Sequence, residues 1–142
     1  MNIEKQIIEY RAEQSEQKRC DMQKLNESIL RLNRASKIWF LDGKDDNGKI
    51  VSNPNIGYGV QTIKYARGKT KEFYQKGLSA NTTGISIYIV RIDDKKYLAN
   101  TYGDIIGKAI ITGYCIKFKS LTDINIDILI EAIKYSLIRN WK

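Results

Sequence analysis

Basic side chains gather around one expected turn in the middle of the chain. Lys64, Arg67, Lys69 and Lys71 lie close together in sequence, and Glu72 is the nearest acid. Positive charges held together on a solvated loop attract anions. The aromatic residues interleaved with them are also typical of surfaces on which single-stranded bases stack. Lysine at a sheet edge has a simpler role as well, because it opposes aggregation.

The pair Arg67–Gly68 predicts the turn of a β-hairpin. With a two-residue loop, Ala66 pairs with Lys69 and Lys64 lies opposite Lys71. Two ammonium groups in that position repel each other at a cost of a few tenths to about 1 kcal/mol. We therefore expect a tip that is either well solvated or in contact with an anion.

Four aromatic residues on expected strands form a second candidate site. A concave sheet gathers such side chains into a pocket with a polar rim, which suits a small molecule or a protein segment. The same side chains also suit an ordinary hydrophobic core, and the sequence leaves both interpretations open. The four residues are Trp39, Tyr58, Tyr74 and Tyr88.

A short acidic row is the third group of candidate residues. Glu9, Glu13 and Glu16 are spaced by four and three residues, so they share a face if the first helix extends that far. Carboxylate oxygens bind hard cations and ferrous iron. Lys5 and Arg11 lie close by, and a solvated helix face with ion pairs explains the same pattern. We therefore expect no metal site and keep the three glutamates only as weak metal candidates.

The chain contains no histidine, which excludes several catalytic classes. Ser-His-Asp and Cys-His catalysis both need an imidazole, and Cys20 and Cys115 are too few for a four-cysteine zinc site. Gly57 and Gly59 are similar to the start of a dinucleotide fingerprint, but Thr62 replaces the third glycine and a strand is expected in place of the helix. We expect no catalytic residues, no cofactor and a non-enzymatic protein.

Three helices are expected to frame the protein. Two of them, residues 2–13 and 15–33, open the chain, and the third closes it at roughly residues 125–139. Ser15 is the expected N-cap of the second helix. Their apolar stripes are Ile3, Ile7 and Ile8; Met22, Leu25, Ile29 and Leu32; and Ile126, Leu129, Ile130, Ile133 and Leu137.

Short strands separated by turn residues lie between these helices. Alternation predicts which side chains share a face of the sheet, because successive residues of a strand point to opposite sides. A block of hairpin-linked strands with helices at both ends indicates an α+β fold with an antiparallel sheet. Ile85, Ile87 and Ile89 alternate with Ser86 and Tyr88, and Tyr114, Ile116 and Phe118 are expected to face inward while Cys115, Lys117 and Lys119 face outward.

Three segments together resemble the YdhG-like domain-of-unknown-function family. They are NIGYG before the basic hairpin, GISIYIV after it, and IGKAIITGYCIKFKSLTDINIDILIEAI near the end, and the resemblance covers roughly residues 20–140. It implies a curved antiparallel sheet of about five to six strands with two N-terminal helices and one C-terminal helix, related in shape to secretion-chaperone-like folds. It implies no established catalytic residues. Frataxin-like iron handling has been proposed for some relatives, but it uses an acidic ridge and this chain is basic.

Length and charge bound the remaining possibilities. The 142 residues suit a single domain over residues 1–142. The formal net charge is +8, and most of it lies in residues 48–82. No segment offers the ~20 apolar residues of a membrane helix, and the N-terminal residues have no apolar run typical of a signal peptide. We therefore expect a cytoplasmic protein with no membrane partner.

Three functions follow as expectations. The first is a non-enzymatic binding domain that holds a small molecule or a protein segment on its sheet face. The second is a binder of polyanions or single-stranded nucleic acid that uses the hairpin tip. The third, implied by the resemblance alone, is a frataxin-like iron-handling protein.

Overall fold

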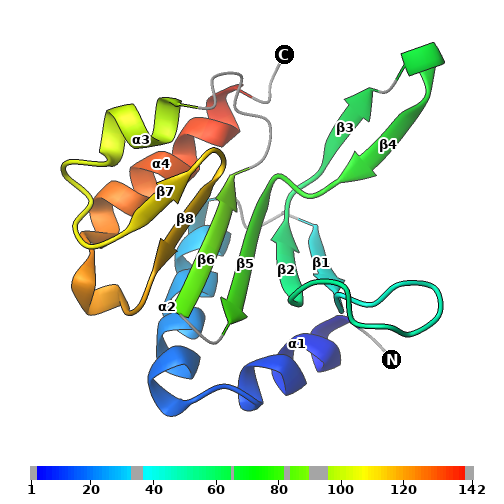
Figure 1. Ribbon diagram of the computed structural model, residues 1–142, viewed down its shortest axis with the longest axis horizontal. Helices are drawn as coiled ribbons and strands as arrows, with labels where there is room; N and C mark the ends of the chain where they lie inside the picture. Colours follow the sequence, from blue (N-terminus) through cyan, green and yellow to red (C-terminus); the bar gives the residue numbers. More distant parts are fainter. Residues whose placement is uncertain (1–2, 33–36, 65, 82–83, 90–95, 140–142) are drawn as a thin grey trace.

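Six antiparallel strands form the central sheet of the computed structural model, which describes residues 3–32, 37–64, 66–81, 84–89 and 96–139 (Figure 1). Side chains are described throughout these ranges except at 63–64 and 135–139. Sequence neighbours lie side by side at most positions, as is usual for hairpin-linked strands. The spatial order is β1 (Ile38–Leu41), β2 (Asn55–Tyr58), β5 (Lys76–Asn81), β6 (Gly84–Ile89), β8 (Cys115–Phe118) and β7 (Ile110–Thr112).

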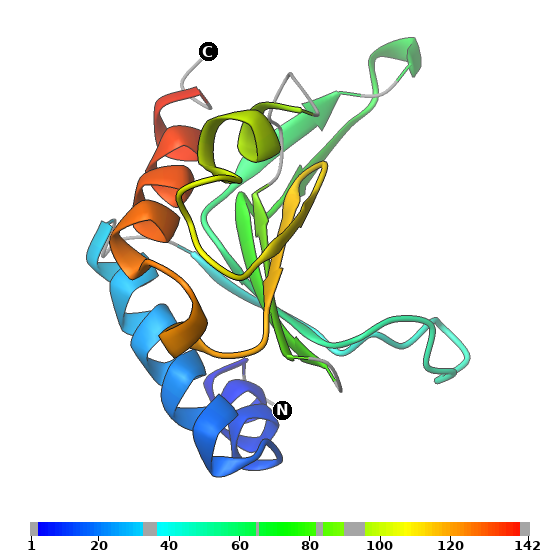
Figure 2. The same cartoon turned by 60° about the vertical axis from the view of Figure 1, so that its left-hand side comes forward.

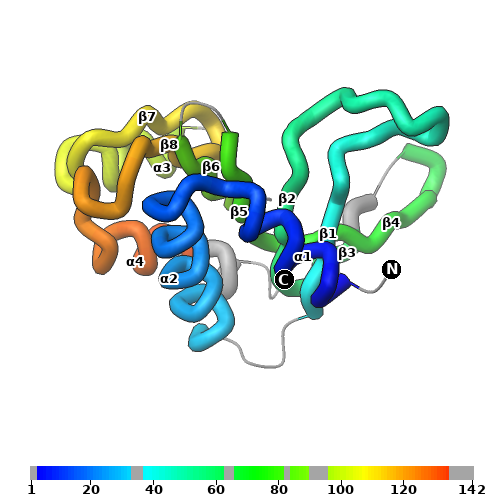
Figure 3. Tube along the Cα trace, turned by 90° about the horizontal axis from the view of Figure 1, so that it is seen from below, coloured from blue at the N-terminus to red at the C-terminus, as the bar shows by residue number. Residues whose placement is uncertain are grey.

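The described helices pack against one face of this sheet. They are α1 (Ile3–Ala12), α2 (Glu16–Leu32), α3 (Tyr97–Tyr102) and α4 (Ile126–Arg139). Figure 2 shows α2 and α4 side by side, along one side of the strands. Figure 3 shows α1 across the end of the strands, where it contacts β1 and α2. Buried side chains from all four helices join one hydrophobic core with the inward-facing residues of the strands.

Local hydrogen bonds explain where two of the helices begin. The Ser15 hydroxyl oxygen accepts from the Lys18 amide at 3.3 Å, which confirms the predicted N-cap of α2. In the same way, Asn125 Oδ1 accepts from the amide of Asp127 at 3.0 Å. Helix α1 differs from its predicted stripe, because Ile3 and Ile8 are exposed.

The buried residues of α1 are Ile7 and Tyr10. Tyr10 faces inward because its hydroxyl oxygen accepts a hydrogen bond from the Ala80 amide of β5 at 2.8 Å. Its polar tip is thus satisfied while its ring is buried, as is usual for a buried tyrosine.

A separate hairpin, which we call the arm, projects from the sheet (Figure 1). It consists of β3 (Gln61–Lys64), the short 3₁₀ turn Ala66–Gly68 and β4 (Thr70–Phe73). Gly59 joins it to β2 with a φ of +81°, a left-handed conformation that favours glycine. The backbone bends there, so the arm pairs within itself as a two-stranded sheet.

The predicted register of the arm is wrong by one residue. Lys64 pairs with Thr70, and Lys71 lies opposite Ile63. The reason is a connection longer than two residues, in which the described residues Arg67 (φ 68°) and Gly68 (φ 77°) are both left-handed. Lys64 and Lys71 are therefore not directly opposite each other, and the expected repulsion between a directly opposed pair of lysines does not arise.

The predicted α+β class is confirmed, with an antiparallel sheet, two N-terminal helices and a C-terminal helix, to which α3 is an addition. The alternation in β8 is confirmed for Ile116 and Phe118, which are buried in the core. Tyr114 is 36% exposed instead of inward, because it lies in the tight turn beside Gly113. None of the described helices has the length and apolar character needed to cross a membrane.

Candidate functional site

The face of the sheet turned away from the helices carries the candidate site, and we call it the open face. Ile56 and Tyr58 of β2 point into the helix-covered core, so Gly57 between them faces the other way. Register places Gly57 beside Gly77. The same row crosses all six strands and consists of Trp39, Gly57, Gly77, Tyr88, Cys115 and Thr112.

An aromatic ring lies directly on the two glycines of this row. A Cβ atom at Gly57 would come within 2.6 Å of Tyr74 Cδ2, and one at Gly77 within 3.0 Å of Tyr74 Cε1. Phe73 stacks on Tyr74 with ring centroids 4.1 Å apart, and Trp39 meets Phe73 edge-on at 6.3 Å. Tyr74 is thus buried between backbone and ring, while Trp39, Phe73 and Tyr88 stay partly exposed. We call these four residues the aromatic patch.

Two lysines place positive charge beside the aromatic patch. Lys37 Nζ lies 4.2 Å from the ring centroid of Trp39, and Lys71 Nζ lies 5.8 Å from that of Phe73. Both distances are within the range of a cation–π contact. Trp39 is held in place by its Nε1–H, which donates to the carbonyl of Gly59 at 2.9 Å.

The prediction that Trp39, Tyr58, Tyr74 and Tyr88 form one pocket is wrong for Tyr58. Tyr58 lies on the helix-covered face, is fully buried, and donates a hydrogen bond to Asn26 Oδ1 of α2 at 2.6 Å. Strand alternation is the reason, since Tyr58 directly follows Gly57. Burial raises the pKa of the Tyr58 hydroxyl above its ordinary value. The other three residues gather on the open face.

Burial also raises the pKa of the hydroxyls on the open face. The pKa of Tyr74 rises to about 12, and that of Tyr88 rises in the same direction for the same first cause. Both groups therefore stay protonated near neutral pH and act as hydrogen-bonding groups rather than as bases. Burial likewise raises the pKa of the Cys115 thiol beside them.

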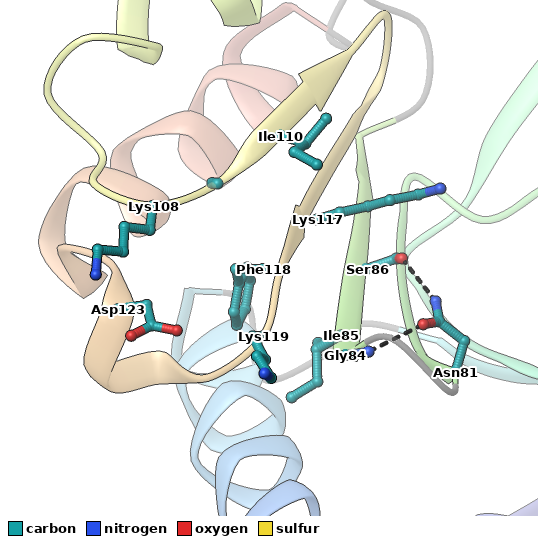
Figure 4. A pocket seen from close by; sticks show the side chains of 11 residues that line it. Asn81, Gly84, Ile85, Ser86, Lys108, Ile110, Lys117, Phe118, Lys119 and Asp123 are labelled. Atoms are coloured by element: carbon teal, nitrogen blue, oxygen red, sulfur yellow. Dashed lines mark hydrogen bonds between the residues drawn. The ribbon is translucent and has the colours of Figure 1, made fainter.

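A cavity of about 490 Å³, which we call the hollow, opens at the β6–β8–β7 end of the open face (Figure 4). Ser86, Lys117 and Ile110 lie side by side across these three strands. Asn81 Nδ2 donates to Ser86 Oγ at 3.3 Å, and Asn81 Oδ1 accepts from the Gly84 amide at 3.0 Å. The charged residues that line the hollow are Lys108, Lys117, Lys119 and Asp123.

The four predicted anion contacts lie on the arm. Arg67, Lys69 and Lys71 are exposed. Lys64 belongs to β3, but its side chain lies outside the described residues. The structure therefore places at least three of the four basic residues in solvent around the loop of the arm, as the sequence predicted.

The acidic row is divided between two helices. Helix α1 ends at Ala12, so Glu13 lies in the following turn and Glu16 is the first residue of α2. The premise of one continuous helix face is wrong, because Ser15 starts a new helix. Glu9 and Glu13 instead line a shallow cavity of about 350 Å³ together with Asp42. Among the described residues, no group of three or more His, Cys, Asp or Glu side chains is placed to hold a metal ion.

Sequence reasoning missed the hollow and its lysines. Lys117 and Lys119 were predicted to face away from the core, but nothing local showed that Lys108 lines the same cavity. Pairing of β7 with β8 brings them together. Two further acceptors also went unnoticed, since Asn55 Oδ1 and Gln61 Oε1 are buried without a hydrogen-bond partner in the part of the chain that the structure describes.

Comparisons with protein-family models, with curated proteins and with solved structures find no match for this chain. The YdhG-like resemblance of the sequence therefore stays a prediction. So does the iron handling that it implied.

Proposed function

We propose that the protein is a cytoplasmic, non-enzymatic binding domain that holds a small molecule or a protein segment on its open face. One observation carries this proposal: partly exposed aromatic side chains are concentrated on the sheet face on which no described helix packs. Exposed aromatic and apolar surface of this kind marks ligand or protein contact sites on soluble proteins.

The patch is preformed. Tyr74 is fixed between the two glycines and Phe73, and Trp39 is fixed by its hydrogen bond to Gly59. A ligand that meets rigid rings loses less conformational entropy on binding than one that has to order them.

A thermal-shift screen of small molecules and short peptides tests the proposal. Binding to the native state alone raises the apparent melting temperature. Hits are then measured against Tyr88→Ala on the open face and against Tyr114→Ala in the β7–β8 turn, which removes a partly exposed tyrosine elsewhere. We expect Tyr88→Ala to weaken binding about 10-fold or more, a loss of about 1.4 kcal/mol.

The matched control decides the outcome. Tyr114→Ala should leave the affinity of the same hits within about twofold, because surface substitutions away from a site act weakly. A screen without hits, or hits that both variants weaken equally, contradicts binding on the open face.

Polyanion binding through the arm is a second candidate. It is favoured by the exposed basic residues Arg67, Lys69 and Lys71 on a hairpin that projects into solvent. A labelled oligothymidylate should bind with an affinity that falls steeply with salt, with a log–log slope of about −0.7 for each neutralised phosphate.

The double variant Lys69→Gln/Lys71→Gln should then lose most of this binding. Lys24→Gln/Lys134→Gln, which removes the same charge from exposed positions on α2 and α4, is the matched control. Equal losses in the two double variants would indicate net charge alone, and absence of binding at low salt would exclude this candidate.

A further inference from the structure

We propose that the hollow is an oxyanion subsite of the open face, which takes the carboxylate or phosphate group of a ligand whose aromatic or alkyl body lies toward Ile110 and Tyr88. The proposal deepens the proposed function and rests on it. It adds the chemical class of the ligand, which the aromatic patch alone does not define.

The shape of the hollow suits a ligand group. Its volume of about 490 Å³ lies within the usual range of ligand pockets, roughly 300–1,000 Å³. Its floor is made of small residues, since Gly84 and Ser86 occupy consecutive outward positions of β6. The floor is closed beneath them, because Ile85 and Phe118 are buried in the core.

The charge of the hollow favours an anion. Lys117 and Lys119 occupy alternate positions along one edge of the cavity, and Lys108 lines it from the segment before β7. Within the described residues none of the three forms an ion pair, and Asp123 is the only acidic side chain among the lining residues. Figure 4 shows the ammonium groups of these lysines pointing in different directions, so an oxyanion in the cavity requires the flexible lysine side chains to turn toward it, where the opposite charges attract.

The side chains next to the lysines indicate the chemistry of the uncharged part of the ligand. Ile110 is paired with Lys117 across the β7–β8 ladder and is 66% exposed. Tyr88 lies on the same face, two residues along β6 from Ser86. An apolar body that follows this face meets Ile110 and Tyr88 while its charged end stays among the lysines. Figure 4 shows Ile110 and Lys117 on the side of the hollow nearest the β7–β8 turn.

Titrations at low ionic strength, followed through backbone amide signals by NMR, test the proposal. The probes are phenyl phosphate, benzoate and uncharged phenol. We expect the two oxyanions to shift the amides of residues 84–86, 108–110 and 117–119, with a Kd of about 1 mM or tighter for at least one of them. Phenol should leave these amides unchanged, and the stronger oxyanion tells a phosphate site from a carboxylate site.

Lys117→Met removes the charge and keeps most of the side-chain stem. It should weaken oxyanion binding about 10-fold, and Lys119→Met provides a second variant of the same kind. Lys24→Met is the matched control, because it makes the same change in net charge at an exposed site on α2. Its amide spectrum and that of Lys117→Met verify that both variants are folded.

Two results would overturn the subsite. One is the absence of oxyanion-induced shifts around the hollow, and the other is equal weakening by Lys117→Met and Lys24→Met. Either result leaves the proposed function to be decided by its own comparison of Tyr88→Ala with Tyr114→Ala, so the two failures are distinguishable.

Discussion

Lys76 is the buried charged residue of the helix-covered face. Its side chain is only 2% exposed and lies between Tyr58 and Ile89 on the neighbouring strands. No partner for its ammonium group is found among the described residues. Burial therefore lowers the pKa of Lys76 to about 8, against an ordinary value of 10.5.

This shift predicts that Lys76 destabilises the fold at neutral pH. Below about pH 8 the amine is charged in both the native and the unfolded state. Burial of the charged amine then destabilises the native state by its full desolvation free energy. Between about 8 and 10.5 the native state has lost the proton and the unfolded state keeps it, so stability rises with pH across this window. Lys76→Met should raise the free energy of unfolding by roughly 1–3 kcal/mol at pH 7, and by less at pH 10.

Urea unfolding at the two pH values measures this effect. Lys24→Met, at an exposed position, should change the stability little at either pH. A loss of stability in Lys76→Met at pH 7, or a gain that stays the same at pH 10, would contradict the assignment of a buried, uncompensated amine.

At the scale of elements, the contact of Tyr74 with Gly57 and Gly77 joins the end of the arm to the sheet. The pair of glycines removes two side chains from the middle of the open face, and the tyrosine ring occupies the space. Glycine in a strand often marks such a close approach. The ring of Phe73, which stacks on Tyr74, depends on this contact for its position.

Gly57→Ala should destabilise the protein, because its Cβ would lie within 2.8 Å of three atoms of Tyr74. We expect a cost of about 1–3 kcal/mol, as for other overpacked sites. In a Tyr74→Ala background the same substitution should cost much less, and a double-mutant cycle by urea unfolding measures the difference. Equal costs in the two backgrounds would show that Tyr74 does not fill this space.

At the scale of the whole molecule, the arm is structurally separate from the core. Its strands form their own sheet, and the hydrophobic core contains none of the described residues of the arm. The fold therefore depends on the six-stranded sheet and its helices. We therefore expect the arm to contribute little to the stability of the fold.

Replacement of residues 62–72 by Asn-Gly tests this separation, because Gln61 and Phe73 are directly paired and a two-residue turn can join them. The formal net charge falls from +8 to +5. The melting temperature should change by no more than about 4 °C, or about 1 kcal/mol, as measured by circular dichroism. A cooperative transition that is lost altogether would contradict the independence of the arm.

Local patterns in the sequence determined a large part of this molecule. Alternation in Ile85, Ile87 and Ile89 placed one face of β6 in the core, and Ser15 marked the start of α2. These features were predictable because each depends on side chains within a few residues of one another. The α+β class followed from the order of such elements.

The tertiary structure alone decided which distant residues meet. The register of the arm depends on pairing between separate segments. So do the face of the sheet to which Tyr58 points and the position of Lys108 and Lys117 around one cavity. A shift of one residue in strand register moves every side chain of the strand to the other face of the sheet. The register cannot be read from the sequence of one strand alone. The basic and aromatic residues were visible in the chain, but the surface that they form together was not.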